Sequence, residues 1–194
     1  IGLHDVDTSL LGGSTNDTAI VDNVSFYDAT DELHVDFQYT APTDEKTTIL
    51  TSLGGGVAAI DFDLDESMDL FFPQGGPLPD VADRSSDVDC LLRRRRAAFS
   101  NVSEVAIPAT SDYGHGTASA DVNNDGFPDL FVTNFGTNQL LINNGDGTFT
   151  DATADTGMTD AAWSVSSALE DFDSDGDLDI YVCIYDTSSL TSII

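Results

Sequence analysis

The chain has 194 residues, 35 of them acidic and 6 basic, which gives a formal net charge of -29. A field of this sign repels phosphate backbones and anionic lipids, so the composition argues against nucleic acid and acidic membrane surfaces as partners and favours cations. The acidic residues are 30 Asp and only 5 Glu, which favours turns and short-armed oxygen ligands over helices, and no run of 18 apolar residues predicts a membrane span.

Along the chain, we expect an N-terminal extension over residues 1–25 and a repeat region over residues 26–194. A secretory signal would lie outside this chain, because no basic stretch precedes an apolar one. The repeat region begins with a short pattern, Phe-x-Asx-x-Thr/Ser, which occurs at Phe26, Phe99 and Phe149.

Three acidic loops follow the same spacing. Residues 61–69, 121–129 and 171–179 align without gaps, each after a small-residue run and before an apolar, strand-like one. The second and third loops lie 50 residues apart, and so do Phe99 and Phe149. The first loop lies 60 residues before the second, and we place its extra residues in loops near 30–50 and 73–89. Two landmarks with one period indicate a structural repeat.

The complete unit over residues 115–151 predicts four short strands. We expect them at Thr117–Asp121, Asp129–Thr133, Gln139–Ile142 and Thr148–Asp151, with a hairpin turn at Asn143-Asn-Gly-Asp-Gly. Four strands in 50 residues and no helical period predict an all-β fold. We therefore predict a partial β-propeller of about two to three four-stranded blades, with a repeated β-sandwich as the alternative.

The 50-residue offset aligns Arg93–Arg96 with the turn at Asn143, so we expect no regular hairpin there. The arginines are interpreted as a solvated loop that pairs with acids, with a nucleic-acid or processing signal as the alternative. We therefore expect one complete blade between two partial ones. Open apolar faces and strand edges on such a chain favour self-association.

Within each loop, counting from its first Asp, oxygen side chains occupy positions 1, 3, 5 and 9. Short oxygen ligands on alternate residues of a tight turn are typical of Ca²⁺ sites, with the backbone carbonyl at position 7 as a further ligand. An EF-hand is excluded, because position 12 holds Phe72, Val132 and Val182. Acidic turns without an ion are the alternative. The predicted ligands are Asp61, Asp63, Asp65, Ser67 and Asp69; Asp121, Asn123, Asp125, Phe127 and Asp129; and Asp171, Asp173, Asp175, Asp177 and Asp179.

The three loops are not equivalent. Gly126 and Gly176 supply the sharp turn at position 6, where the first loop has Glu66. Glu66 must adopt a positive φ or open the turn, so we expect the first loop to bind Ca²⁺ more weakly than the others.

The loops, their lead-in runs and their Asp-Leu-Phe-type exits resemble the FG-GAP/VCBS repeats of integrin-like β-propellers. The match covers residues 26–185, and Asn138-Gln-Leu-Leu-Ile-Asn-Asn-Gly-Asp-Gly-Thr-Phe is typical of it. The wider pattern is similar to bacterial and cartilage acidic proteins that carry an ASPIC/UnbV domain, although no such segment is visible. The resemblance implies Ca²⁺ in the hairpin loops, a secreted, extracellular or cell-envelope location, and a binding or adhesion scaffold for protein or glycan.

No catalytic constellation occurs in the chain, so we do not expect an enzyme. His115 is the one candidate, and a lone histidine beside a strand is more often structural. The pattern Asp61-Phe-Asp also fits a haloacid-dehalogenase nucleophile strand, but it occurs three times and the chain has a single Lys. The alternatives are a spacer, or a propeller-based hydrolase or polysaccharide lyase with its catalytic residues outside this segment.

Overall fold

The computed structural model describes residues 25–40, 49–52, 54–76, 88–109, 112–158 and 162–186. In this part the fold is mostly β, with antiparallel sheets, and none of its helices is long and apolar enough to cross a membrane. The strands are β1 (Ala58–Ile60), β2 (Asp69–Phe72), β3 (Cys90–Arg95), β4 (Ala98–Asn101), β5 (Tyr113–Ala120), β6 (Asp129–Gly136), β7 (Gln139–Asn143), β8 (Phe149–Asp151), β9 (Ala162–Glu170) and β10 (Asp179–Asp186). The helical turns are α1 (Thr30–Leu33), η2 (Leu50–Ser52), α2 (Ser103–Ala106) and η3 (Thr153–Asp155).

The first blade is a complete four-stranded sheet in the order β1-β2-β3-β4. The expectation of a partial blade here is wrong, because the arginine run forms a hairpin: Arg95 pairs with Ala98 across a two-residue turn. Arg96 makes this turn with a φ of +59°. The side chains of Arg95 and Arg96 are exposed to water, so their like charges do not prevent the strands from pairing.

The pairing also corrects the alignment by one residue. Leu92 pairs with Leu70 in the first blade, and Leu141 pairs with Leu130 in the second. These third strands are therefore 49 residues apart, and Arg94, not Arg93, stands at the place of Asn143. The hairpin of the first blade is one residue shorter, which restores the 50-residue offset at Phe99.

The second blade contains the four predicted strands, β5 to β8, in antiparallel pairing. The first two are longer than expected, since β5 begins at Tyr113 and β6 continues to Gly136. The predicted hairpin turn forms, with positive φ at Gly145 and Gly147. β6 is buried over almost its whole length because both faces of this blade are covered.

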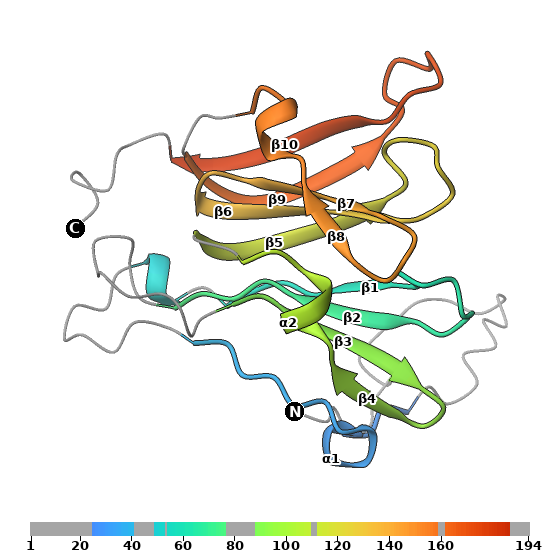
Figure 1. Ribbon diagram of the computed structural model, residues 1–194. Helices are drawn as coiled ribbons and strands as arrows, with labels where there is room; N and C mark the ends of the chain where they lie inside the picture. Colours follow the sequence, from blue (N-terminus) through green and yellow to red (C-terminus); the bar gives the residue numbers. More distant parts are fainter. Residues whose placement is uncertain are drawn as a thin grey trace, which may run out of the picture.

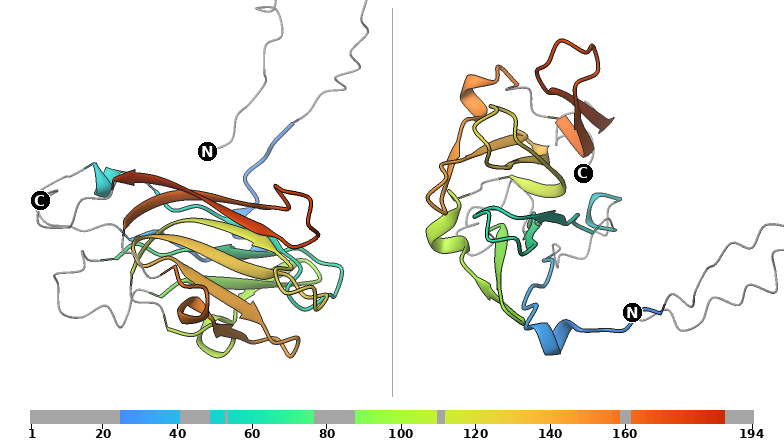
Figure 2. Two further views of the ribbon diagram at one scale, coloured as in Figure 1. Left: turned by 90° about the horizontal axis from the view of Figure 1, so that it is seen from above. Right: turned by 90° about the vertical axis from the view of Figure 1, so that its right-hand side faces the viewer.

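The third unit has two strands in the described part of the chain, β9 and β10. It is joined to the second blade by backbone pairing, because the last two residues of β6 pair with the first two of β9. In Figure 1 the three units follow one another from bottom to top, and the right-hand view of Figure 2 shows the same order from the side.

The other repeated landmark marks a helical turn after the fourth strand. A turn begins four residues after each of Phe26, Phe99 and Phe149, as α1, α2 and η3. The first residue of each turn donates its N–H to the Asx side chain two residues earlier, at 2.9–3.0 Å. Residues 26–30 repeat this cap, and residues 25–29 are not part of a strand.

The main core lies between the first and second blades. It joins Ile60, Phe71 and Leu91 of one blade to Leu130, Leu141 and Phe149 of the other. The rings of Phe62 and Phe149 lie 6.1 Å apart, and Asn143 Nδ2 donates to the carbonyl oxygen of Phe62 at 2.8 Å. The blades therefore pack face to face, as blades of a propeller do.

A smaller core lies between the second blade and the third unit. Tyr113, Phe135 and Trp163 are buried there with Leu50. Tyr113 and Trp163 lie 50 residues apart, in keeping with the repeat, and both are buried between the units. Leu53, at the equivalent position before the first loop, lies outside the described residues.

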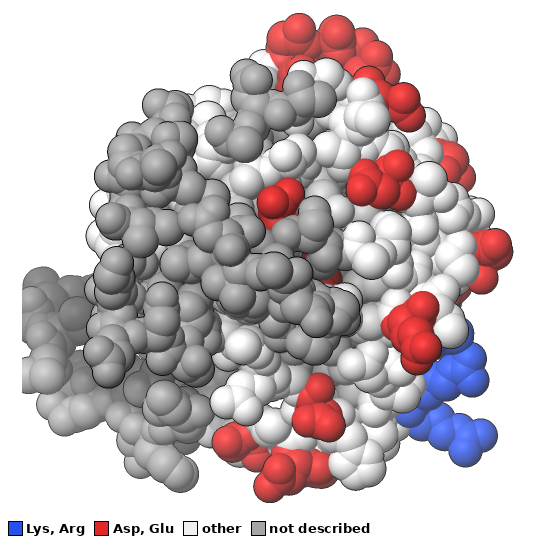
Figure 3. Space-filling view, turned by 60° about the vertical axis from the view of Figure 1, so that its left-hand side comes forward, with Lys and Arg blue, Asp and Glu red and all other residues white. Residues whose placement is uncertain are grey.

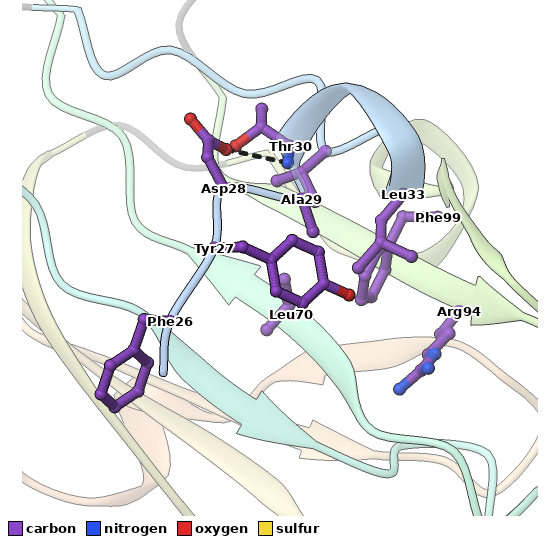
Figure 4. A pocket seen from close by; sticks show the side chains of 10 residues that line it. Phe26, Tyr27, Asp28, Ala29, Thr30, Leu33, Leu70, Arg94 and Phe99 are labelled. Carbon is purple, nitrogen blue, oxygen red and sulfur yellow. Dashed lines mark hydrogen bonds between the residues drawn. The ribbon is translucent and has the colours of Figure 1, made fainter. Parts of the chain in front are cut away.

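Part of residues 26–40 packs against the first blade. Phe37 stacks on Phe72 with ring centroids 4.5 Å apart. Nearer the start of this segment, a cleft of about 450 Å³ opens between Tyr27 and the side chains of Leu70, Arg94 and Phe99 (Figure 4).

Replacing Trp163 with Ala tests the junction of the last two units. Trp163 is 1% exposed and contacts the rings of Phe135 and Tyr185, so the substitution leaves a large cavity. We expect the free energy of unfolding to fall by about 3–5 kcal/mol in chemical denaturation. Val105→Ala, at a residue that is 76% exposed, is the control and should change it by less than about 0.5 kcal/mol. Equal effects would contradict this packing.

Candidate metal-binding loops

The three acidic loops share one backbone shape, held by the same four hydrogen bonds. The position-1 carboxylate accepts the N–H groups of positions 5 and 6, position 5 accepts that of position 7, and position 9 accepts that of position 2. All twelve distances lie between 2.8 and 3.3 Å. All three loops leave their sheets on the right-hand side of Figure 1.

This shape requires a positive φ at two positions. At position 6, Gly126 and Gly176 have φ of +94° and +99°, and Glu66 adopts +66°, as predicted for a loop that does not open. At position 4, Leu64, Asn124 and Ser174 also have positive φ, which sequence analysis missed. Asn124 was the available signal, because Asn tolerates this region better than other non-glycine residues.

The turn brings the carboxylates of positions 1, 3 and 5 together. In the first loop (Asp61, Asp63, Asp65) and in the third (Asp171, Asp173, Asp175), ligand atoms of all three residues lie within 4.8 Å of one another. In the second loop, Asn123 Oδ1 accepts the N–H of Asp125 at 3.0 Å, and its Nδ2 donates to Asp125 Oδ2 at 2.9 Å.

Position 9 lies beneath the loop and binds the backbone on two sides. Asp69 and Asp129 are 0% exposed, and each also accepts an N–H from the third strand: that of Arg94 at 2.6 Å and that of Asn143 at 2.8 Å. Burial raises the pKa of Asp69 to about 6, against these hydrogen bonds, and raises the pKa of Asp129. Asp179 is exposed and accepts the N–H of Phe172. These three aspartates are outside the grouped triads, so their role as metal ligands stays a prediction.

Position 7 comes close to the triad through its N–H. Ser67, Phe127 and Asp177 each donate this N–H to the position-5 carboxylate. Their carbonyl groups as further ligands also stay a prediction. Carboxylate and amide oxygens gathered in one short turn form the donor set that hard divalent cations prefer, so these residues fit an ion such as Ca²⁺.

The family comparison agrees with this geometry. The profile of the FG-GAP-like repeat matches residues 121–182, from the first aspartate of the second loop to β10 just beyond the third. Residues 121–182 are an FG-GAP-like repeat. The repeat therefore includes two of the three acidic loops, and it implies propeller blades for this part of the chain. No curated protein matches the chain.

His115, the candidate catalytic residue, is a core residue of the second blade, on β5. It is 4% exposed, and its ring lies 5.2 Å from that of Tyr113 and 5.9 Å from that of Trp163. Burial lowers the pKa of His115 to about 4, so the imidazole is neutral at pH 7. The structural interpretation of this histidine is the one that the packing supports.

His115 makes stability depend on pH. The unfolded chain protonates this histidine near pH 6.5 and the folded chain near pH 4, so stability is lost as pH falls through that window. Between pH 7 and pH 4.5 we expect about 2 kcal/mol of this loss to be absent in His115→Phe, which cannot take up a proton. Denaturant unfolding of both proteins at pH 7 and pH 4.5 measures this difference in stability. The contribution of the acidic residues is common to both proteins and cancels in the comparison. Parallel losses would contradict the buried neutral state.

Proposed function

We propose that this chain is a calcium-stabilised, non-catalytic propeller segment that acts as a binding or adhesion scaffold for a protein or glycan. The observation that carries the proposal is the identical hydrogen-bonded turn of all three loops, which directs oxygen side chains inward at positions 1, 3 and 5. FG-GAP-like repeats are typical of propeller binding scaffolds, and residues 121–182 are such a repeat.

The charge of the loops supports a bound cation. The third loop carries five aspartates in nine residues and the second carries three, with no basic side chain in either. Carboxylates this close repel one another, and the turn's N–H groups offset only part of that charge. A divalent cation at positions 1, 3 and 5 would offset much of the rest and would hold the turn closed.

The exposure of the loops supports an extracellular or cell-envelope location. Positions 3 to 6 of the second and third loops are exposed to water, which is the setting of weak calcium sites. Such sites, with dissociation constants of about 10⁻⁴–10⁻³ M, fill where calcium is millimolar, as it is outside cells.

The surface supports a partner other than nucleic acid. In Figure 3, acidic side chains are spread over the visible face and basic ones gather at one edge. The four basic residues in the described part of the chain are Arg93–Arg96. A protein or a glycan would therefore meet a surface that is mainly acidic and neutral.

Calcium should raise the melting temperature of the full chain. An ion that binds only the folded state, at about 1 to 10 times its dissociation constant, stabilises it by about 0.4–1.4 kcal/mol per site. We expect a rise of several degrees between excess chelator and millimolar calcium, followed by calorimetry. Asp125→Asn and Asp175→Asn should each remove part of this rise.

The matched control is Asp155→Asn, which makes the same charge change at an exposed residue outside the loops. It should keep the full response to calcium. A melting temperature that is the same in chelator and calcium would refute the calcium sites.

We also propose that the chain self-associates through the third unit. Tyr181 on β10 is 64% exposed, whereas Phe71 and Phe131, its counterparts two residues after position 9 in the other blades, are 0% and 1% exposed. Ile184 and Tyr185 are also exposed. β10 thus exposes to water an aromatic position that the corresponding strands of the other two blades bury.

We expect small oligomers at micromolar concentration in calcium, measured by light scattering, and Tyr181→Asp should shift them toward monomer. Added salt should strengthen association because it screens the net charge of -29. Thr150→Asp, at an exposed residue of β8, is the control. A monomer at all salt concentrations would contradict this proposal and leave the calcium sites untouched.

A further inference from the structure

Arg93 reaches from the third strand of the first blade into the first acidic loop. Its guanidinium Nη2 forms an ion pair with Asp63 Oδ2, at position 3 of that loop. The Arg93 Cζ atom also lies 5.9 Å from the centroid of the Phe62 ring. The side chains are 27% and 11% exposed, so the pair is partly withdrawn from water.

Asp63 lacks a hydrogen bond that its counterparts in the other loops make. Asn123 and Asp173, at the same position, accept the N–H of position 5 at 3.0 and 3.2 Å. Neither oxygen of Asp63 accepts a hydrogen bond. Arg93 is thus the partner of the Asp63 carboxylate, which accepts no hydrogen bond from the loop.

The second blade has no equivalent of Arg93. The pairing of Leu92 with Leu70 and of Leu141 with Leu130 places Ile142 at the corresponding position. An isoleucine brings no charge to the second loop. The described part of the third unit has only its first two strands, so no third-strand side chain reaches the third loop from it.

Asp63 lies both in the predicted metal-binding triad and in an ion pair. It belongs to the triad with Asp61 and Asp65, whose ligand atoms lie within 4.8 Å of one another, and it is the ion-pair partner of Arg93. A divalent cation on this triad would share Asp63 with the guanidinium, and the two positive charges would repel each other. Binding of the ion therefore requires breaking or weakening the ion pair.

We propose that Arg93 takes the place of a metal ion in the first loop, so that this loop closes without calcium and binds it poorly. The proposal rests on the calcium-loop function proposed above. It goes beyond that function because it names the side chain that weakens calcium binding in the first loop. Charge alone would predict that the first loop binds calcium more tightly than the second, because the first and third loops each carry five acidic residues and the second carries three.

The test isolates the first loop in the full chain. In a chain carrying Asp125→Asn and Asp175→Asn, calcium affinity is measured by titration calorimetry with Arg93 intact and with Arg93→Gln. We expect the affinity of the first loop to rise on the order of tenfold when the charge is removed. Arg95→Gln is the matched control, since it makes the same charge change at an exposed residue of the same strand and should leave the affinity unchanged.

A second variant and a second measurement guard against a folding defect. Arg93→Ile copies the residue of the second blade and should give the same gain. In excess chelator, Arg93→Gln and Arg93→Ile should each melt below Arg95→Gln, because Asp63 then loses its counter-charge, and calcium should restore more of their stability than of the control's.

Equal calcium affinity and equal melting in the Arg93 and Arg95 variants would overturn this inference while the second and third loops still bind in the unaltered chain. Absence of calcium binding by every loop, in the unaltered chain and in both Arg93 variants, would instead refute the proposed function together with the inference.

Discussion

Each complete blade depends on one buried aspartate. Asp69 and Asp129 have no exposed surface, and a buried carboxylate is tolerable only where donors replace the water it has lost. Their donors are backbone N–H groups from two different places: the second residue of the loop and the third strand of the blade. One side chain therefore holds the loop closed and fixes the register of the strand that returns beside it. Asp179, whose unit has only its first two strands in the described part of the chain, is exposed and accepts the N–H of Phe172.

The closed loop requires unfavourable positive φ angles and brings carboxylates close together. The three loops differ in how they accommodate these two requirements. Two residues of every loop have positive φ, and in the first loop both are non-glycine residues with long side chains, Leu64 and Glu66. The carboxylates that bind the loop's N–H groups also crowd negative charge. The first loop receives a guanidinium from β3, the second replaces one carboxylate with the amide of Asn123, and the third retains five aspartates. One backbone shape thus persists while the charge within the loop and the groups around it change.

Spacing in the sequence was enough to predict the three loops, the four strands of residues 115–151 and the hairpin turn at Asn143. Those features follow from local chemistry: alternating apolar residues, Asn-Gly turns and short oxygen side chains. The hairpin at Arg93–Arg96 could not be read this way, because its register is set by the pairing of Leu92 with Leu70 and not by its own turn residues. The ion pair of Arg93 with Asp63 joins residues 30 apart, so no local pattern reveals it. The burial of position 9 was missed for the same reason, since one of its donors lies on another strand.

The glycines before the loops explain how the units approach one another. A Cβ atom on Gly56 would lie 3.2 Å from the Cα of Gly116, and the N–H of Gly56 donates to the carbonyl oxygen of His115 at 2.6 Å. A Cβ on Gly116 would in turn lie 2.7 Å from the carbonyl oxygen of Val165 in the third unit. Gly116 therefore lies close to the backbone of the segment before β1 on one side and of β9 on the other. A side chain there would separate the strands and open the cores around Phe149 and Trp163. The small residues of the lead-in thus set the distance between units, and the acidic loops can vary in charge because they lie at the rim, away from these contacts.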